Sequence, residues 1–289
     1  MRNTLKAFQA FVIFGVATAL SSVQALAQDE SADAEPQIVN PQVTDAVTQS
    51  DARLINGKSL ASVKPRLDGY VAAHMVDHFP PGLFVAIATK DEALILPYGV
   101  ANFETGEAAT DETLFRIASI SKTFVWTSVM MLVDEGLIDL DTDVNVYLKN
   151  IKIPDAFGAP VTMNDLMAHR AGFEDTLGDF FSGHAGLTTE EMLIRQMPKR
   201  VAPPGLRVSY SNWGTTLASQ IIADVSGVPF DAFVRQRIFA PLGLDETTLR
   251  DPALSASAAR NPADLDARTA RPHVMEEGAP TPVDYASVE

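Results

Sequence analysis

The sequence predicts a mixed α/β chain in which an early β-hairpin is followed by a mostly helical region. Two apolar runs, 83–89 and 93–101, are separated by the charged triplet Lys90-Asp91-Glu92, a pattern typical of a hairpin. Beyond it, apolar residues recur at helical spacing in several segments that Gly- and Pro-rich turns separate. Two strands alone are only marginally stable in water, so we expect the hairpin to join more sheet or to pack against a helix.

Taken in order, the elements begin with a helix ahead of the hairpin. We expect order to start near Leu60, because apolar residues then fall at helical spacing. After the hairpin, an apolar block predicts a helix that ends at Gly136, and the acidic segment 137–148 turns the chain away. The pattern predicts further helices over 163–169, 188–197, 213–225 and 230–239. The tail 251–289 has weak periodicity.

The first 27 residues have the features of a secretory signal peptide. Arg2 and Lys6 precede a short apolar stretch, 10–20, and Ala25-Leu26-Ala27 offers a small-residue cleavage site. The apolar stretch is far shorter than the ~20 residues that a membrane span needs. Residues 28–57 are polar, acidic and free of aromatic side chains, which predicts a flexible leader. We therefore expect a periplasmic or secreted protein.

Composition limits the partners of the mature chain. The full sequence, signal segment included, has 289 residues with a formal net charge of −15, which argues against a nucleic acid or an anionic membrane as partner. The chain has no cysteine, which excludes a cysteine nucleophile and thiolate metal ligands. No later apolar run is long enough to span a bilayer. We expect no metal and no cofactor, and a small-molecule or peptide-like substrate; the oligomeric state stays open.

One pair of residues carries chemistry at the start of the apolar helix. Ser119 and Lys122 are three positions apart, so a helix would bring the amine to the hydroxyl. Apolar surroundings and a helix N-terminus both disfavour a charged amine, and a neutral amine can activate a serine as a nucleophile. Taken alone, the pair is a weak signal, and a capping serine with a lysine whose stem lies along apolar surface is the simpler interpretation.

A second motif stands ahead of a later predicted helix. Tyr210-Ser211-Asn212 follows the turn "PPGLR". A loop tyrosine there could relay a proton, and the Asn212 amide could hold Lys122 and a substrate carbonyl. By itself, the triplet is also compatible with an ordinary surface turn.

Together these motifs and their flanks resemble the serine β-lactamase and penicillin-binding-protein superfamily. The similarity is closest to class C β-lactamases and their esterase and D-aminopeptidase relatives. It extends over 60–249 and includes "FRIASISKTFVWTSVMMLVDEGLIDL", "VTMNDLMAHRAGF" and "SYSNWGTTLASQIIADVSG". The resemblance implies that Ser119 is the nucleophile, that Lys122 is its base, and that Tyr210 with substrate-binding Asn212 completes the proton relay.

The resemblance also implies the complete fold class, α/β of the α+β type. An antiparallel sheet flanked by helices would be joined to a mostly helical domain, and residues 58–289 would form the N-terminal portion of this fold, with an incomplete sheet. Most strands of that sheet come from the family's C-terminal third, whereas only the first hairpin can be recognised here. The family's third motif, Lys-x-Gly or His-x-Gly on a strand after the Tyr-x-Asn loop, is also missing. We therefore expect this sequence to be the N-terminal portion of a longer protein.

The histidines offer weaker candidates. His184-Ala185-Gly186 matches the third motif in letters, but it precedes Tyr210 and is interpreted as a turn. His74 and His78 have the spacing of a metal pair on a helix, yet no third ligand is evident. His169 at a helix end is expected to satisfy terminal carbonyls.

Two functions remain from the sequence. The first is an exported serine hydrolase that forms an acyl-enzyme on Ser119 from an amide, an ester or a β-lactam. The alternative is an inactive binding protein or remnant with the same fold.

Export leads to a direct prediction. Expressed whole in a bacterium, the protein should lose residues 1–27 and begin at Gln28, because signal peptidase cleaves after the small-residue site. Intact-mass measurement of the mature protein checks this. A mature chain that still carries Phe11 to Leu20 would contradict it.

Overall fold

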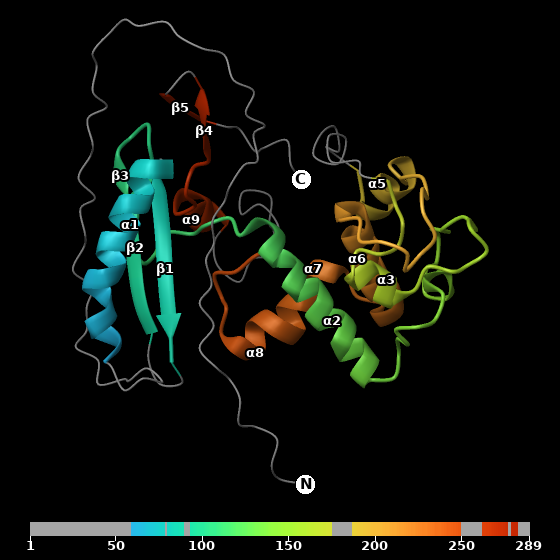
Figure 1. Cartoon of the computed structure of the whole chain (residues 1–289). Coiled ribbons are helices and arrows are strands. Elements are labelled where there is room, and N and C mark those ends of the chain that lie inside the picture. The colour runs from blue at the N-terminus through green and yellow to red at the C-terminus, as the bar shows by residue number, and fades with distance from the viewer. Residues whose placement is uncertain are drawn as a thin grey trace, which may run out of the picture. The chain divides into compact units, whose positions relative to one another are not determined.

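The computed structural model describes residues 59–78, 80–89, 93–174, 187–249, 262–276 and 279–282. Within these ranges the chain forms two compact units, one from 59–118 and 268–282 and the other from 119–267 (Figure 1). The predicted signal peptide, the leader and the triplet at His184 lie outside the described residues.

The first unit contains a helix and a three-stranded antiparallel sheet. The 3₁₀ turn η1 (Leu60–Val63) leads into α1 (Lys64–His78), which is followed by β1 (Gly82–Ala88), β2 (Ala93–Asn102) and β3 (Glu107–Ala108). The strand order is β1-β2-β3, and the hairpin register runs from Gly82 opposite Gly99 to Ala88 opposite Ala93. The predicted hairpin is therefore present, and α1 lies along it (Figure 1).

Apolar side chains of α1 and of the hairpin share one core. Its buried members are Leu60, Val71, Val85, Leu94, Leu96 and Tyr98. At the far end of the hairpin, Gly99 has a φ of 71°, and a Cβ there would collide with the Pro81 carbonyl and the Met75 side chain. Glycine alone accepts both the left-handed backbone and the close approach. Immediately after it, the β2–β3 register shifts between Val100 and Asn102.

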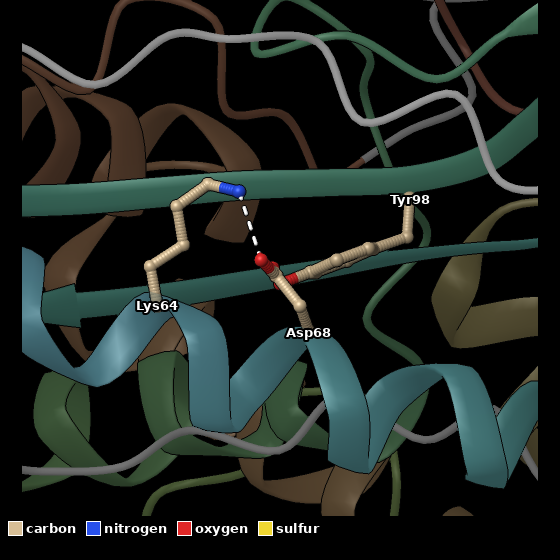
Figure 2. Close-up of polar contacts among 3 residues, drawn as sticks. All are labelled: Lys64, Asp68 and Tyr98. Atoms are coloured by element: carbon tan, nitrogen blue, oxygen red, sulfur yellow. Dashed lines mark hydrogen bonds and ion pairs between the residues drawn. The ribbon is translucent and has the colours of Figure 1, made fainter.

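A polar contact also joins α1 to the sheet. The Tyr98 hydroxyl donates to Asp68 Oδ1 at 2.9 Å, and Lys64 Nζ donates to Asp68 Oδ2 at 3.0 Å. Figure 2 shows Asp68 on α1 between the two donors. The Tyr98 side chain is buried, so its hydroxyl needs this partner. Burial, and then the hydrogen bond and charge of Asp68, raise the pKa of Tyr98 above its ordinary value.

The late part of the chain contains more regular structure than the sequence predicts. The helix α9 (Pro262–Ala267) precedes a second hairpin, β4 (His273–Glu276) with β5 (Ala279–Pro282). The expectation that only the first hairpin can be recognised was therefore wrong. Three prolines, Pro272, Pro280 and Pro282, and the lack of apolar alternation removed the usual strand signal.

Backbone hydrogen bonds tie this late segment to the hairpin region. Leu114 N donates to Arg268 O at 2.9 Å, and Ala270 N returns a bond to Leu114 O at 2.8 Å. Arg271 N donates to Ala101 O, also at 2.8 Å. Residues more than 150 positions apart thus complete the first unit.

The regular elements in the described part of the second unit are helices and helical turns, joined by irregular segments and two isolated β-bridges. In chain order its elements are α2 (Lys122–Asp134), η3 (Val144–Val146), α3 (Met163–Met167), α5 (Thr189–Arg195), α6 (Asn212–Ser226), α7 (Phe230–Val234), η4 (Arg235–Phe239), α8 (Ala240–Leu242) and α9. The four later helices that the sequence predicts are present, with ends moved by a few residues. The helix predicted over 230–239 is α7 followed by the π-helical turn η4, which runs into α8.

The α2 and α6 helices share the main core of this unit. Val125, Val129 and Leu132 of α2 are buried with Trp213 and Leu217 of α6. Because each helix buries one face in the same core, packing fixes where their first residues lie.

No single helix in the described part of the chain has the length and apolar character to cross a bilayer. The α6 helix and the segment Phe230–Leu242 reach that criterion only together, across a bend of 76°.

The contact of Tyr98 with Asp68 leads to a stability prediction. Tyr98→Phe should lower the free energy of unfolding by about 1 kcal/mol near neutral pH, because it removes one hydrogen bond and leaves Asp68 paired with Lys64. Above about pH 10 the unfolded chain ionises this tyrosine while the folded state keeps its proton, so wild-type stability falls as the pH rises. That alkaline fall should be smaller in the variant.

Urea unfolding followed by circular dichroism at neutral and alkaline pH measures both effects. Tyr70→Phe, which alters an exposed tyrosine on α1, the helix that carries Asp68, is the matched control. Equal stability of the two variants at both pH values would contradict the role given to the Tyr98 hydroxyl.

Candidate active site

The nucleophile candidate Ser119 lies in a 3₁₀ turn rather than in the α-helix that the sequence predicts. Ala118–Ser121 form the turn η2, and α2 begins at Lys122. Side chains three apart eclipse each other in a 3₁₀ turn, so Ser119 and Lys122 still share one side. Ala118 has a φ of 45°, a left-handed value that is uncommon for a residue with a side chain.

All four residues predicted from the two motifs come together. Ser119 Oγ lies 2.7 Å from the Tyr210 hydroxyl and 3.1 Å from Lys122 Nζ. Lys122 Nζ also donates to Asn212 Oδ1 at 2.7 Å. The same amine lies 4.9 Å from the centre of the Tyr210 ring, within the range of a cation–π contact. The 90 residues between the motifs therefore close into one small polar cluster.

Exposure differs across this cluster. Ser119 is exposed and the Tyr210 side chain is 42% exposed, whereas Lys122 and Asn212 are half-buried. The hydroxyl groups thus face solvent, and the amine lies behind them where the protein supplies its hydrogen-bond partners. A molecule arriving from solvent would meet the serine first.

The start of α6 places Tyr210 and Asn212. Ser211 is the N-cap residue, and its Oγ accepts from Gly214 N at 2.9 Å, which satisfies one of the free N–H groups of the first turn. Trp213 is buried, and its indole N–H donates to Leu193 O at 3.1 Å. The cap and the buried indole together hold Asn212 between them.

His169 also belongs to this neighbourhood, although the sequence assigned it another role. Its ring lies 4.4 Å from the Tyr210 ring, and its Nδ1 accepts from Ser211 N at 3.2 Å. The expected contact with a terminal carbonyl is made by the backbone, since His169 N donates to Leu166 O at 3.1 Å in the last turn of α3. The imidazole is instead directed toward the Tyr210 segment, which the sequence did not predict. Burial, and then the charge of Lys122, lower the pKa of His169 below its ordinary value.

Of the remaining histidines, His74 is the one whose side chain the structure describes, and it lies on α1, in the first unit. His74 stacks beside Tyr70 on α1, with ring centres 6.4 Å apart, and the side chain of His78 lies outside the described part of the chain. Within the residues that the structure describes, no group of three or more His, Asp or Glu side chains could hold a metal ion.

The chain is also similar to known proteins in sequence and in structure. Penicillin-binding protein 4 of Amycolatopsis lactamdurans is 30% identical over 191 residues, which cover 62% of this chain and 47% of that protein. The octameric penicillin-binding protein homologue from Pyrococcus abyssi is 29% identical with a TM-score of 0.64, covering 76% of this chain and 50% of the other. D-amino acid amidase from Ochrobactrum anthropi, also 29% identical, has a TM-score of 0.61 with 79% and 61% covered.

These likenesses confirm the predicted fold class, an antiparallel sheet with helices and a mostly helical region. The chain spans about a third to a half of the length of the curated relatives that it matches first. The family model described as Beta-lactamase matches residues 67–287, most of the chain, which includes all four clustered side chains. The protein therefore belongs to the β-lactamase family.

Proposed function

We propose that this protein is an exported serine hydrolase that forms an acyl-enzyme on Ser119. The observation that carries the proposal is the cluster in which Lys122 Nζ and the Tyr210 hydroxyl both lie within hydrogen-bond distance of Ser119 Oγ. A serine hydroxyl beside an amine and a phenol that can exchange protons with it is the arrangement that covalent catalysis by a hydroxyl needs.

In the first step Ser119 Oγ attacks the substrate carbonyl carbon, and the new O–C bond forms as the carbonyl electrons move to oxygen. The serine proton passes to the unprotonated amine of Lys122, along the 3.1 Å contact. Only the fraction of protein with an unprotonated amine is competent for this transfer.

In the second step the carbonyl re-forms and the bond to the leaving group breaks. The Tyr210 hydroxyl, 2.7 Å from Ser119 Oγ, can give its proton to the departing nitrogen or oxygen and regain one from Lys122. Water then attacks the ester, loses a proton to the same groups, and releases the acid with Ser119 restored.

Asn212 supports both steps in this proposal. Its Oδ1 accepts from Lys122 and fixes the amine beside the serine. The amide's Nδ2 is then the group that can donate to a substrate carbonyl. A substrate would be an amide, an ester or a β-lactam, which agrees with relatives named penicillin-binding protein, β-lactamase and D-amino acid amidase.

Export is the part of the proposal that rests on the sequence alone. The basic start, the short apolar stretch and the small-residue site before Gln28 support it. Such a protein would meet its substrate outside the cytoplasm.

Covalent labelling tests the nucleophile. The intact protein should react with a fluorescent phosphonate or a fluorescent penicillin, and Ser119→Ala should abolish the label because the attacking oxygen is gone. Ser121→Ala is the matched control, since it removes a hydroxyl from the same turn that makes no capping bond. Absence of label on the intact wild-type protein, or persistent label in Ser119→Ala, would reject the proposal.

Substitution of the amine tests the base. Lys122→Ala should slow labelling by about 10²–10⁴-fold, the usual value of general-base assistance. Lys122→Arg should be no better, because a guanidinium keeps its proton at any accessible pH. Stopped-flow or gel-based labelling rates decide the point, with Lys152→Arg at an exposed lysine as the control. A near-normal rate in Lys122→Arg would exclude proton transfer to this residue.

A further inference from the structure

We propose that His169 is a positioning residue, whose neutral imidazole holds Tyr210 and the backbone ahead of α6 in place beside Ser119. The inference rests on the proposed function, because it concerns how the proton relay is kept in place. It assigns a role to a histidine that touches neither Ser119 nor the reacting atoms.

The backbone around His169 is fixed independently of its side chain. Ser209 N donates to His169 O at 2.7 Å, Gly205 N donates to Arg170 O at 2.9 Å, and Val201 N donates to Gly172 O at 2.8 Å. The turn after α3 is thus joined at three points to the segment that leads to Tyr210. Such a fixed turn is a rigid platform from which a side chain can act.

The imidazole adds two contacts that the backbone cannot make. Its Nδ1 accepts the N–H of Ser211, a buried residue with 8% exposure, so the neutral ring carries its proton on Nε2. Its face lies 4.4 Å from the Tyr210 ring at an angle of 34°, and Trp126 of α2 approaches it edge-on at 6.4 Å. The ring is therefore held between α2 and the residue that it positions.

Ring contact and hydrogen bond restrain consecutive residues. Tyr210 cannot swing away from Ser119 without leaving the imidazole face, and Ser211 cannot shift without losing a partner for a buried N–H. Asn212 follows directly, and its amide holds Lys122. One imidazole thus restrains the segment that supplies two of the four clustered side chains.

Charge makes this role depend on the neutral ring. Protonation would place an N–H at Nδ1 against the Ser211 N–H, so the two donors would face each other. It would also add a positive charge near Lys122, the group on α2 that already lowers the pKa of His169. Tyr210 packs against the ring from the α6 side, and the ionisable residues nearest to His169 along the chain are Asp165, on α3, and Arg170, in the turn after it. Asp165 accepts from Thr162, and the Arg170 guanidinium donates to Gly205 O.

The backbone of His169 suggests a matched pair of variants. Its φ of 53° is left-handed, a conformation that glycine and asparagine adopt at little cost. His169→Asn can keep an acceptor near the position of Nδ1, but it cannot take up a proton. His169→Gly keeps the backbone and removes both side-chain contacts. Differences between the two variants therefore report the side chain rather than strain.

The experiment measures the rate of Ser119 labelling by a fluorescent phosphonate in the intact protein, at saturating probe and across pH. His169→Gly should lower the maximal rate by about 10–100-fold, because a buried N–H is left without a partner. His169→Asn should recover most of that loss. Between about pH 7 and pH 5, where an imidazole titrates, the wild-type rate should fall more steeply than that of His169→Asn.

A second measurement does not depend on activity. In ¹⁵N spectra of the folded protein, His169 should be neutral near pH 7 with its proton on Nε2, and its pKa should lie below 6.5. Equal losses in the folded Asn and Gly variants, the same acid limb in wild type and His169→Asn, or a proton on Nδ1 would each overturn the inference.

The two proposals fail in different ways. If the intact wild-type protein is not labelled, or labelling does not need Ser119, the proposed function fails. If labelling requires Ser119 but neither His169 variant changes its rate, the proposed function stands and the role of His169 is rejected.

Discussion

The Lys122 amine is the contact on which the candidate site depends, because it reaches each of the other three side chains. It donates to Ser119 Oγ and to Asn212 Oδ1, and it lies over the ring of Tyr210. These contacts are short enough that a small shift of either helix would break them. Whatever fixes the position of this one nitrogen therefore also fixes the candidate site.

Packing in the second unit fixes the position of the Lys122 nitrogen. Lys122 is the first residue of α2 and Asn212 is the first residue of α6, and the two helices bury faces in one core through residues such as Val129 and Leu217. A close-packed core of this kind leaves little freedom for one helix to slide on the other. Both N-terminal ends also favour negative charge, which the proposed reaction would develop on the substrate carbonyl.

Backbone strain is concentrated at the same place. Among the described residues, those other than glycine with positive φ are Ala118, Phe157 and His169. Two of these three flank the cluster, one directly before Ser119 and one beside Tyr210. Such conformations cost free energy and persist where the surroundings determine them fully, which is typical of functional sites. At His169, backbone hydrogen bonds between this turn and residues 201–209 hold the unusual conformation in place.

The local pattern predicted much of this molecule. Periodicity identified α1, the β1–β2 hairpin, α2 and the four later helices up to residue 239, since each buries one apolar face and carries turn residues at its ends. It missed α9, and it failed for β4 and β5, because Pro272 precedes β4, Pro280 and Pro282 lie in β5, and pairing with each other rather than their own propensity holds the two strands. It also did not show that Ser119 lies in a 3₁₀ turn ahead of the α-helix that starts at Lys122, because a 3₁₀ turn and an α-helix have nearly the same spacing over one turn.

For the site, the sequence by itself determined which groups are present and which neighbours they have along the chain. The spacing of Ser119 and Lys122 and the triplet ending at Asn212 named the four clustered side chains, because helical geometry and family resemblance are both readable from local order. Only the tertiary structure decided that His169 faces Tyr210 and accepts from Ser211. That contact joins residues about 40 positions apart. It exists because α3 and α6 share a core and because backbone hydrogen bonds join the turn after α3 to residues 201–209. Neither feature can be seen in the local order of the sequence.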